Sequence, residues 1–200
     1  MSDARGDPRL VLRREARILR RRIPAPARIT AAQRLSERLF ALPWTCTHGH
    51  VAGYWAMDGE IALNAWQLRL PSTVTYCLPV LHDDQRLRFA PWRPGAPLTS
   101  NRYGIPEPLV AEGALLVPED MALVMVPLVA FDAACHRLGM GGGWYDRSFA
   151  FRRTRAAPPW LVGAGFVAQQ VESLPVAPWD VPLDAVCTDL ATHLREPASP

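Results

Sequence analysis

Residues 121–147 read MALVMVPLVAFDAACHRLGMGGGWYDR, an apolar run followed by a polar connection and a cluster of glycines. The first part, 121–131, has no charged side chain, which is typical of a strand buried on both faces of a parallel sheet. Four glycines then fall within the five positions 139–143, before two aromatic residues and an Asp-Arg pair. We predict a central strand that leads through a glycine loop into a helix from about residue 144 to 155.

Strand and helix patterns alternate on both sides of this stretch, and no internal repeat is present. A turn at Asp58-Gly59 precedes a helix expected from about residue 60 to 69, and the Pro- and Gly-rich residues 93–119 read as an extended loop. Short apolar or alternating runs predict further strands at 50–57, 73–81, 86–92, 160–168 and 184–190. The predicted fold is α/β, with a mainly parallel central sheet flanked by helices.

The N-terminal segment predicts a basic amphipathic helix over residues 8–23. Four apolar residues recur at helical spacing on one face, and four arginines recur on a neighbouring face. The apolar positions are Leu12, Ala16, Leu19 and Ile23, and the basic ones are Arg9, Arg13, Arg17 and Arg20. The prolines of PAPA, 24–27, are expected to end this helix.

A second helix is expected to open at Thr30, because Thr30 and Gln33 have the spacing of a capping box. Its inward positions would be Ala32, Leu35 and Leu39. We expect one domain over residues 1–200, with flexible tails at 1–7 and 191–200.

Composition excludes several classes of protein. Apolar residues make up 49% and charged residues 20%, which is ordinary for a globular chain. No apolar run reaches membrane-spanning length, the N-terminus lacks a signal-peptide core, and the four cysteines form no CxxC pair. These features predict a cytoplasmic protein without a membrane partner.

The chain contains no lysine, so all 22 basic residues are arginine. This excludes Schiff-base chemistry and a P-loop, since both need a lysine. If the protein binds phosphate, it must use arginine side chains and backbone N–H groups. Eleven of the arginines fall within residues 1–38, which opens nucleic-acid binding as an alternative. The apolar stripe of the basic helix and the net acidic remainder argue against it, so no nucleic-acid partner is expected.

The glycine loop is suited to an anionic ligand. Its backbone can approach a ligand closely, and the helix expected after it would offer unpaired N–H groups. The Rossmann spacing GxGxxG is not met, and a tight turn with no ligand is the simpler alternative. Arg137, Asp146 and Arg147 flank the loop and favour a phosphate site with a metal ligand beside it.

The stretch MVPLVAFDAACHRLGMGGGWYDR resembles the signature of the 5-formyltetrahydrofolate cyclo-ligase family, also called 5,10-methenyltetrahydrofolate synthetase. Other elements are similar and follow in the family's order. They are Arg9 with Leu12-Arg13, GYWAMDGEIALNAW, LPVLHDDQRLRFAPWRPGAPL, NRYGIPEP and PWDVPLDAVCTD, which together span about residues 8–190. Arg9 stands where the family favours lysine, and Trp144 where it favours tyrosine.

The resemblance implies an ATP- and Mg²⁺-dependent closure of 5-formyltetrahydrofolate to 5,10-methenyltetrahydrofolate, with release of ADP and phosphate. The γ-phosphoryl group would activate the formyl oxygen, and N10 of the folate would then displace phosphate. This chemistry needs positioning and charge neutralisation rather than a protein nucleophile. No protein partner is implied.

The resemblance also implies roles for individual residues. Arg137 and Tyr145 would be catalytic. Asp146 and Asp180 would hold Mg²⁺ as hard oxygen ligands, with Asp184 and Asp189 as rivals to Asp180. ATP would be bound by Arg9, Arg13, Arg137, Leu138, Gly139, Met140, Gly141, Gly142, Gly143, Trp144 and Tyr145. The folate would be bound by Trp55, Glu60, Met140, Gly141, Gly142, Gly143 and Trp144.

Two alternatives remain open on the sequence. A nucleotide-binding regulatory protein of the same fold could lack the folate reaction. Separately, Cys46, His48 and His50 have the alternation of metal ligands entering a strand, although a fourth ligand is missing nearby.

Overall fold

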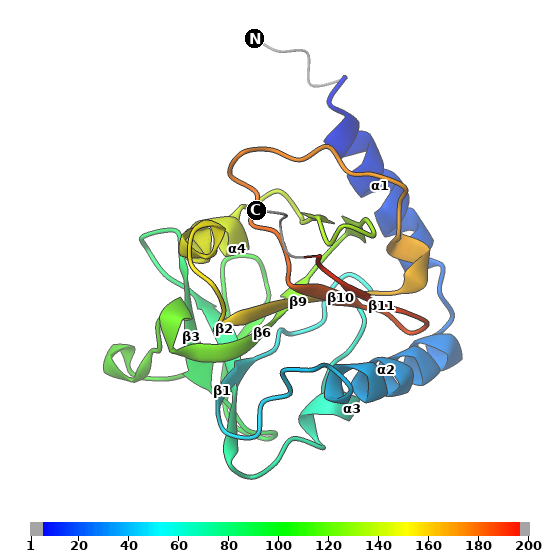
Figure 1. Ribbon diagram of the computed structural model, residues 1–200. Coiled ribbons are helices and arrows are strands. Elements are labelled where there is room, and N and C mark those ends of the chain that lie inside the picture. The colour runs from blue at the N-terminus through cyan, green and yellow to red at the C-terminus, as the bar shows by residue number, and fades with distance from the viewer. Residues whose placement is uncertain (1–5, 197–200) are drawn as a thin grey trace.

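The computed structural model describes residues 6–196 and contains a seven-stranded sheet in the order β11-β10-β9-β6-β1-β2-β3 (Figure 1). Neighbouring strands from β10 to β2 run parallel, and β3 and β11 are antiparallel strands at the two edges. The strands are β1 (Gly49–Ala52), β2 (Val74–Leu81), β3 (Leu87–Pro91), β6 (Met121–Pro127), β9 (Trp160–Ala164), β10 (Ala185–Cys187) and β11 (Thr192–Leu194). The predicted mainly parallel sheet is confirmed.

Helices cover both faces of this sheet. Side chains of α2 and α3, including Leu35 and Trp66, pack with Val51 of β1 on one face. Ala52, the next residue of β1, packs on the opposite face with Phe149 at the end of α4, because successive side chains of a strand point to opposite faces. The α-helices are α1 (Pro8–Arg21), α2 (Ala25–Phe40), α3 (Asn64–Gln67) and α4 (Trp144–Ser148).

Two hairpins and four short 3₁₀ turns complete the chain. The β7–β8 hairpin lies between the central strand β6 and the glycine loop, so the loop does not follow the strand directly as predicted. The hairpins pair β4 (Leu98–Ser100) with β5 (Pro106–Pro108), and β7 (Ala130–Phe131) with β8 (Arg137–Leu138). The 3₁₀ turns are η1 (Glu112–Ala114), η2 (Pro118–Asp120), η3 (Ala150–Arg153) and η4 (Val167–Gln169).

The basic helix α1 lies at the rim of the molecule, beside η4 and the β7–β8 hairpin (Figure 1). The predicted apolar stripe is only partly correct. Ala16 is buried against Val129 and Leu138, but Leu19 is 48% exposed and Arg20 is fully buried in its place. The correction follows from pairing, because Arg20 reaches carboxylate and carbonyl oxygens that Leu19 could not use.

Several predicted helix boundaries are wrong. α1 does end before the PAPA prolines, at Arg21, but these prolines also begin the next helix: Pro24 is the N-cap of α2 and Pro26 lies in its first turn. Thr30 lies inside α2, where its hydroxyl donates to the carbonyl of Pro26, so it forms no capping box. The helix expected over 60–69 is limited to α3, and the helix expected over 144–155 divides into α4 and η3.

Other predictions concern loops and termini. The loop predicted over 93–119 contains the β4–β5 hairpin. The C-terminal tail predicted from residue 191 is wrong for β11, which pairs with β10, and Asp7 caps α1 through the backbone N–H of Arg9. The rest of the predicted tails, at 1–5 and 197–200, lies outside the described residues. Within residues 6–196, no helix is long and apolar enough to cross a membrane.

Candidate active site

The glycine loop joins β8 to α4, and its four glycines have different surroundings. Gly141 and Gly143 have φ of 98° and 65°, a left-handed conformation that side-chain-bearing residues rarely adopt. A Cβ at Gly142 would lie 2.9 Å from Cδ1 of Trp144, whereas a Cβ at Gly139 would meet no heavy atom within 4 Å. The loop therefore combines a tight turn with a stretch of open backbone.

Three arginines from two elements surround this loop. Arg13 of α1 donates from Nε to the carbonyl of Gly139 at 2.9 Å, and Arg9, one turn earlier, pairs with Asp180 at 3.1 Å. Arg137 of β8 donates to Asp146 at 2.8 Å. Among the described residues, the buried Nε atoms of Arg9 and Arg137 have no hydrogen-bond partner. Buried donors without acceptors are costly, so an anion entering here would satisfy them.

The charge balance of the site also favours an anion. Burial and then the charge of Arg9 lower the pKa of Arg13. An arginine remains protonated under such a shift, so the guanidinium groups stay positive and repel one another. A ligand that carries several negative charges would relieve this repulsion.

Two carboxylates join the loop to the segment around residue 180. Asp146, in the first turn of α4, accepts hydrogen bonds at Oδ1 from Arg137 and from the backbone N–H of Val181. Asp180 accepts from Arg9 and from the backbone N–H of Ala177 at 2.8 Å. Within residues 6–196, Oδ2 of Asp146 accepts no hydrogen bond. That oxygen is available to a cation or to a ligand.

The two rival acidic residues have other partners. Asp184 accepts two hydrogen bonds from Arg152, at 2.7 and 2.9 Å, and one from the backbone N–H of Leu161. Asp189 accepts from the backbone N–H of Val167 at 2.8 Å. Both carboxylates therefore brace the end of the sheet around β9 and β10.

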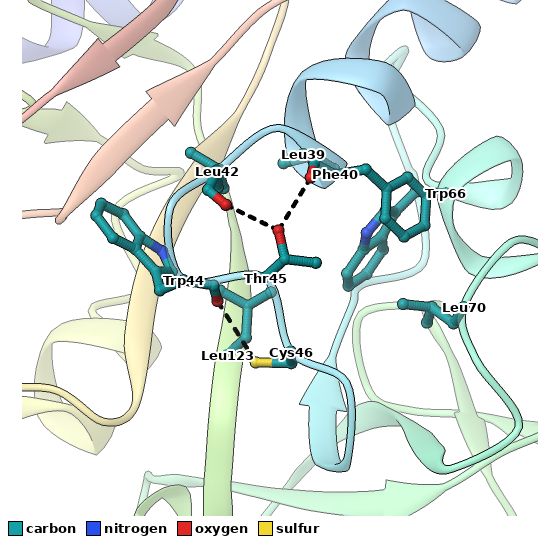
Figure 2. A pocket seen from close by; sticks show the side chains of 9 residues that line it. All are labelled: Leu39, Phe40, Leu42, Trp44, Thr45, Cys46, Trp66, Leu70 and Leu123. Carbon is teal, nitrogen blue, oxygen red and sulfur yellow. Dashed lines mark hydrogen bonds between the residues drawn. The ribbon is translucent and has the colours of Figure 1, made fainter.

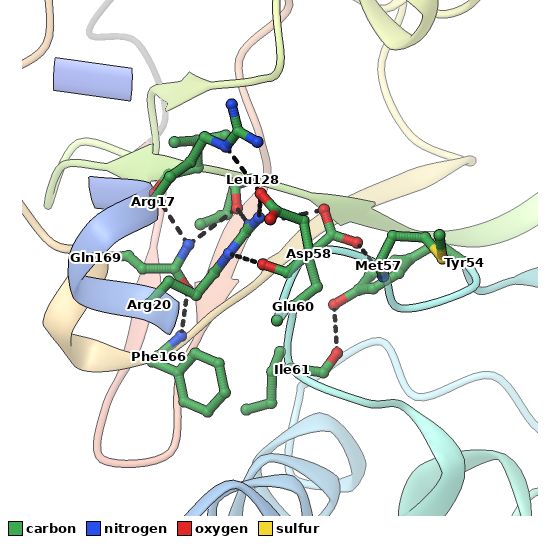
Figure 3. A network of polar contacts seen from close by, with 12 residues as sticks. Arg17, Arg20, Tyr54, Met57, Asp58, Glu60, Ile61, Leu128, Phe166 and Gln169 are labelled. Carbon is green, nitrogen blue, oxygen red and sulfur yellow. Dashed lines mark hydrogen bonds and ion pairs between the residues drawn. The ribbon is translucent and has the colours of Figure 1, made fainter. Parts of the chain in front are cut away.

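Glu60 lies in the turn that follows β1 (Figure 3). Its Oε2 accepts from the backbone N–H of Met57 at 3.0 Å, and its Oε1 lies 3.7 Å from Nη1 of the buried Arg20. The side chain is 13% exposed. Burial raises the pKa of this carboxyl, while the Met57 N–H and Arg20 oppose the rise. Glu60 is thus a nearly buried acceptor with limited access from outside.

The aromatic residues predicted for the site lie on both sides of it. Burial, and after it the charge of Glu60, raises the pKa of Tyr145, which links the glutamate to α4. The Trp144 ring lies between Arg102 and Arg147, whose guanidinium carbons are 5.2 and 5.4 Å from its centroid. Trp55 packs edge-on against Trp92 at 5.8 Å.

A cluster of charges at Asp58 was not predicted from the sequence. Its carboxylate pairs with Arg17, Arg20 and Arg21, all from α1 (Figure 3 labels the first two). Two signals were present, since the arginines had helical spacing and Asp58-Gly59 had the composition of a turn. Nothing in the sequence indicated that these two segments meet.

A cleft of about 260 Å³ adjoins the carboxylates. Its lining is about equally polar and apolar, with Leu174, Val176 and three prolines beside Arg137 and Asp180 of the site. The cleft therefore opens a mixed apolar and charged surface at Arg137 and Asp180.

The possible metal site at Cys46, His48 and His50 is not formed. The Cys46 thiol faces the carbonyl of Trp44 within an apolar pocket between α2, α3 and β6 (Figure 2). His48 is exposed and bonds to Thr47. Among the described residues, no three His, Cys, Asp or Glu side chains are grouped to hold a metal.

Comparisons with known proteins agree in pointing to one family. The family model of 5-formyltetrahydrofolate cyclo-ligase matches residues 6–189. A 5-formyltetrahydrofolate cyclo-ligase of Haemophilus influenzae is 35% identical over 176 residues, covering 86% of this chain and 92% of the relative. That of Escherichia coli K12 is 36% identical over 160 residues, covering 78% and 86%.

Solved structures resemble the fold as well. The NMR structure of Aquifex aeolicus 5,10-methenyltetrahydrofolate synthetase is similar with a TM-score of 0.79 at 27% identity, covering 96% of this chain and 95% of that chain. A 5,10-methenyltetrahydrofolate synthetase from Mycoplasma pneumoniae has the same fold, with a TM-score of 0.69 at 21% identity.

Proposed function

The chain belongs to the 5-formyltetrahydrofolate cyclo-ligase family, and on this premise we propose how its residues perform the reaction. The enzyme is an ATP-dependent ligase that converts 5-formyltetrahydrofolate to 5,10-methenyltetrahydrofolate. The observation that carries the assignment of the site is the convergence of Arg9, Arg13 and Arg137 on a glycine loop with open backbone.

The triphosphate of ATP lies along residues 139–143. The free Nε atoms of Arg9 and Arg137 donate to phosphate oxygens, and Arg13 exchanges its carbonyl partner at Gly139 for phosphate. Backbone N–H groups at the start of α4 contribute further donors, because Gly143 caps that helix without a side chain. The role of these groups is to hold the γ-phosphoryl group in line and to neutralise its charge.

The folate lies on the side of Glu60. The Glu60 carboxylate accepts hydrogen bonds from ring N–H groups of the pterin, and Trp55 and Trp144 supply aromatic surface beside it. Tyr145 stays neutral because burial raises its pKa, so its hydroxyl can donate a hydrogen bond between the two substrates. The link between Tyr145 and Glu60 supports the placement of the formyl group near the loop.

The reaction follows from this arrangement in two steps. The formyl oxygen attacks the γ-phosphorus of ATP, the bond to the bridging oxygen breaks, and ADP leaves. N10 of the folate then attacks the activated formyl carbon, its proton is released, and the carbon–oxygen bond breaks to free phosphate. Arg137 lies where charge develops on the transferred group, and this sequence needs no protein nucleophile.

Mg²⁺ fits the two carboxylates. Asp146 has a free Oδ2 and accepts from the backbone N–H of Val181, the residue that follows Asp180. Mg²⁺ is usually bound by one or two carboxylates together with substrate phosphates, which agrees with the absence of a larger acidic cluster among the described residues. When bound, the ion would neutralise β- and γ-phosphate charge. Asp180 lines one cleft together with Arg137, whereas Asp184 and Asp189 brace β9 and β10, and this position supports Asp180 over both rivals.

An absorbance assay tests the proposed activity. Purified protein with 5-formyltetrahydrofolate and ATP is expected to form the methenyl product, with one ADP released per product. The regulatory alternative predicts ATP binding without product. Product formed equally without ATP would also contradict the proposal. The absence of protein and nucleic-acid partners and the cytoplasmic location stay predictions.

A further inference from the structure

Arg20 of α1 is fully buried, and all three of its nitrogens are used. Its Nε donates to the backbone carbonyl of Asp58, its Nη2 donates to the Asp58 carboxylate at 3.1 Å, and its Nη1 donates to the carbonyl of Leu128. Leu128 follows the central strand β6 directly. One guanidinium group therefore joins α1, the end of β6 and the turn after β1 (Figure 3).

The turn that Arg20 holds is an unusual one. Asp58 and Gly59 both have left-handed backbone, with φ of 50° and 78°. Arg17 adds a hydrogen bond to the Asp58 carboxylate, and Arg28 of α2 donates to the carbonyls of Gly59 and of Arg20. A non-glycine residue at positive φ persists only where its surroundings fix it. The arginines supply that fixation.

The fixed turn ends at Glu60. The carboxylate is oriented from two sides, by the N–H of Met57 and by Arg20 at 3.7 Å, while 13% of the side chain stays accessible. A buried ion pair is a poor source of stability, because its desolvation offsets most of its attraction. Stability alone therefore does not explain why a buried arginine holds this turn, and the position of Glu60 at the end of the turn points to a further role.

We propose that Arg20 is a positioning residue for folate binding, which fixes the Asp58 turn and orients the carboxylate of Glu60 toward the pterin. The proposal rests on the proposed function, because it takes Glu60 as the folate-binding carboxylate. Arg20 lies behind Glu60 and does not contact the folate.

The charges around Glu60 predict how replacing Arg20 or Asp58 changes the pH dependence of folate affinity. Facing it are Arg20 from α1, Asp58 from its own turn, Tyr54 from the segment after β1, and Tyr145 from α4. Arg20 lowers the pKa of Glu60 and Asp58 raises it. The ionised carboxylate accepts pterin hydrogen bonds more strongly than the protonated acid does, so folate affinity falls as pH falls through this pKa. Removing Arg20 moves that fall to higher pH, and removing the Asp58 charge moves it to lower pH.

The test measures KM for folate, KM for ATP, kcat and melting temperature in four variants across pH. Arg20→Gln and Asp58→Asn break the ion pair between Arg20 and Asp58, and Arg20→Lys keeps the positive charge at position 20. Arg14→Gln is the control, because Arg14 lies on the exposed face of α1. We expect Arg20→Gln to raise the folate KM about tenfold or more, because the turn that carries Glu60 loses its charged hydrogen bond from Arg20 to Asp58, with ATP KM within about twofold. Arg20→Lys should recover part of the loss, and Arg14→Gln should match the parent.

The pH profiles then decide between positioning and structural support. The proposal is supported if the pH at which folate affinity falls is higher in Arg20→Gln and lower in Asp58→Asn than in the parent protein. A folded Arg20→Gln protein whose folate KM and its pH dependence are unchanged would overturn the proposal. A rise in ATP KM as large as the rise in folate KM would also overturn it. If Arg20→Gln does not fold, Asp58→Asn is judged by the same criteria. A parent protein that forms no methenyl product would instead refute the proposed function.

Discussion

The glycines of the loop separate two effects that are usually confounded, backbone conformation and close approach of a ligand. Gly143 sits at φ 65° with Arg147 beside it, so a methyl group there strains the chain itself. Gly139 has no positive φ and open space around its Cβ position. A methyl group at Gly139 would meet only the bound ligand.

Gly139→Ala is expected to keep the melting temperature of the ligand-free protein and to lose most of the stabilisation by ATP. In the parent, ATP at a hundredfold excess over Kd should add about 2.7 kcal/mol, from RT ln(1 + [L]/Kd). Gly143→Ala is the matched contrast and should melt earlier without ligand. Differential scanning fluorimetry measures both. If Gly139→Ala gains the full shift with ATP, the phosphates do not lie against residue 139.

Glu60→Gln tests the folate side. The amide keeps the shape of the side chain but loses the charge that strengthens hydrogen bonds from the pterin, a loss of about 1.5–3 kcal/mol in folate binding. ATP affinity should stay nearly unchanged, because Glu60 is not among the groups that surround the glycine loop. Isothermal titration with each substrate measures the two affinities. An equal loss of ATP binding would mean that Glu60 supports the fold.

For single residues, the sequence predicted which residues belong to the candidate site better than it predicted their contacts with one another. Of the arginines expected at the ATP site, Arg13 contacts the loop at Gly139, while Arg9 and Arg137 pair with Asp180 and Asp146; their role in ATP binding stays a prediction. Arg20 was assigned only to a basic face, because helical periodicity cannot distinguish a solvated arginine from one that a distant carboxylate draws into the interior. The pairing of Arg20 with Asp58 depends on tertiary structure.

Among the elements, α1 connects the two halves of the site. Arg9 and Arg13 in its first half contact Asp180 and Gly139, while Arg17 and Arg20 in its second half hold the turn of Glu60. About four turns of helix at 1.5 Å per residue give it the reach to touch both. The bounds of this helix were predicted closely because apolar residues and arginines recur at helical spacing over a long, regular stretch.

The short elements were not predictable in the same way. α3 and α4 have four and five residues, too few for a period of 3.6 to emerge. The α2 boundary failed for another reason, since proline both ends helices and is favoured in their first turn. The inward positions Leu35 and Leu39 were predicted correctly, but they lie too far along α2 to locate its start at Ala25.

Asp146→Asn tests whether the Asp146 carboxylate at the start of α4 binds Mg²⁺ or only tethers the helix to the segment around Val181. The amide oxygen can still accept from the backbone N–H of Val181, so the tether between α4 and that segment should largely persist. The anionic oxygen offered to Mg²⁺ is lost, so the Mg²⁺ concentration for half-maximal activity should rise about tenfold or more. Titration of activity with Mg²⁺ measures this. An unchanged titration with a lower melting temperature would make Asp146 a structural tether alone.

Across the whole molecule, the site lies where three kinds of segment meet: the rim helix α1, the turn after β1 and the loop between β8 and α4. Parallel strands deliver their following segments to one edge of the sheet, which agrees with the expectation of a ligand site at the glycine loop, whereas Glu60 was assigned to the site only through the family resemblance. The position of α1 across that edge could not be read from the pattern. It depends on the pairing of its arginines with Asp58 and Asp180.

The central claim is that the site transfers the γ-phosphoryl group of ATP to the formyl oxygen. The most direct measurement uses 5-formyltetrahydrofolate labelled with ¹⁸O in the formyl group, with mass analysis of the inorganic phosphate formed. Unreacted substrate is recovered as the control for exchange with water. The account predicts one labelled oxygen in each phosphate released with methenyl product. Unlabelled phosphate, formed while recovered substrate keeps its label, would contradict it, because water rather than the formyl oxygen would then have attacked ATP.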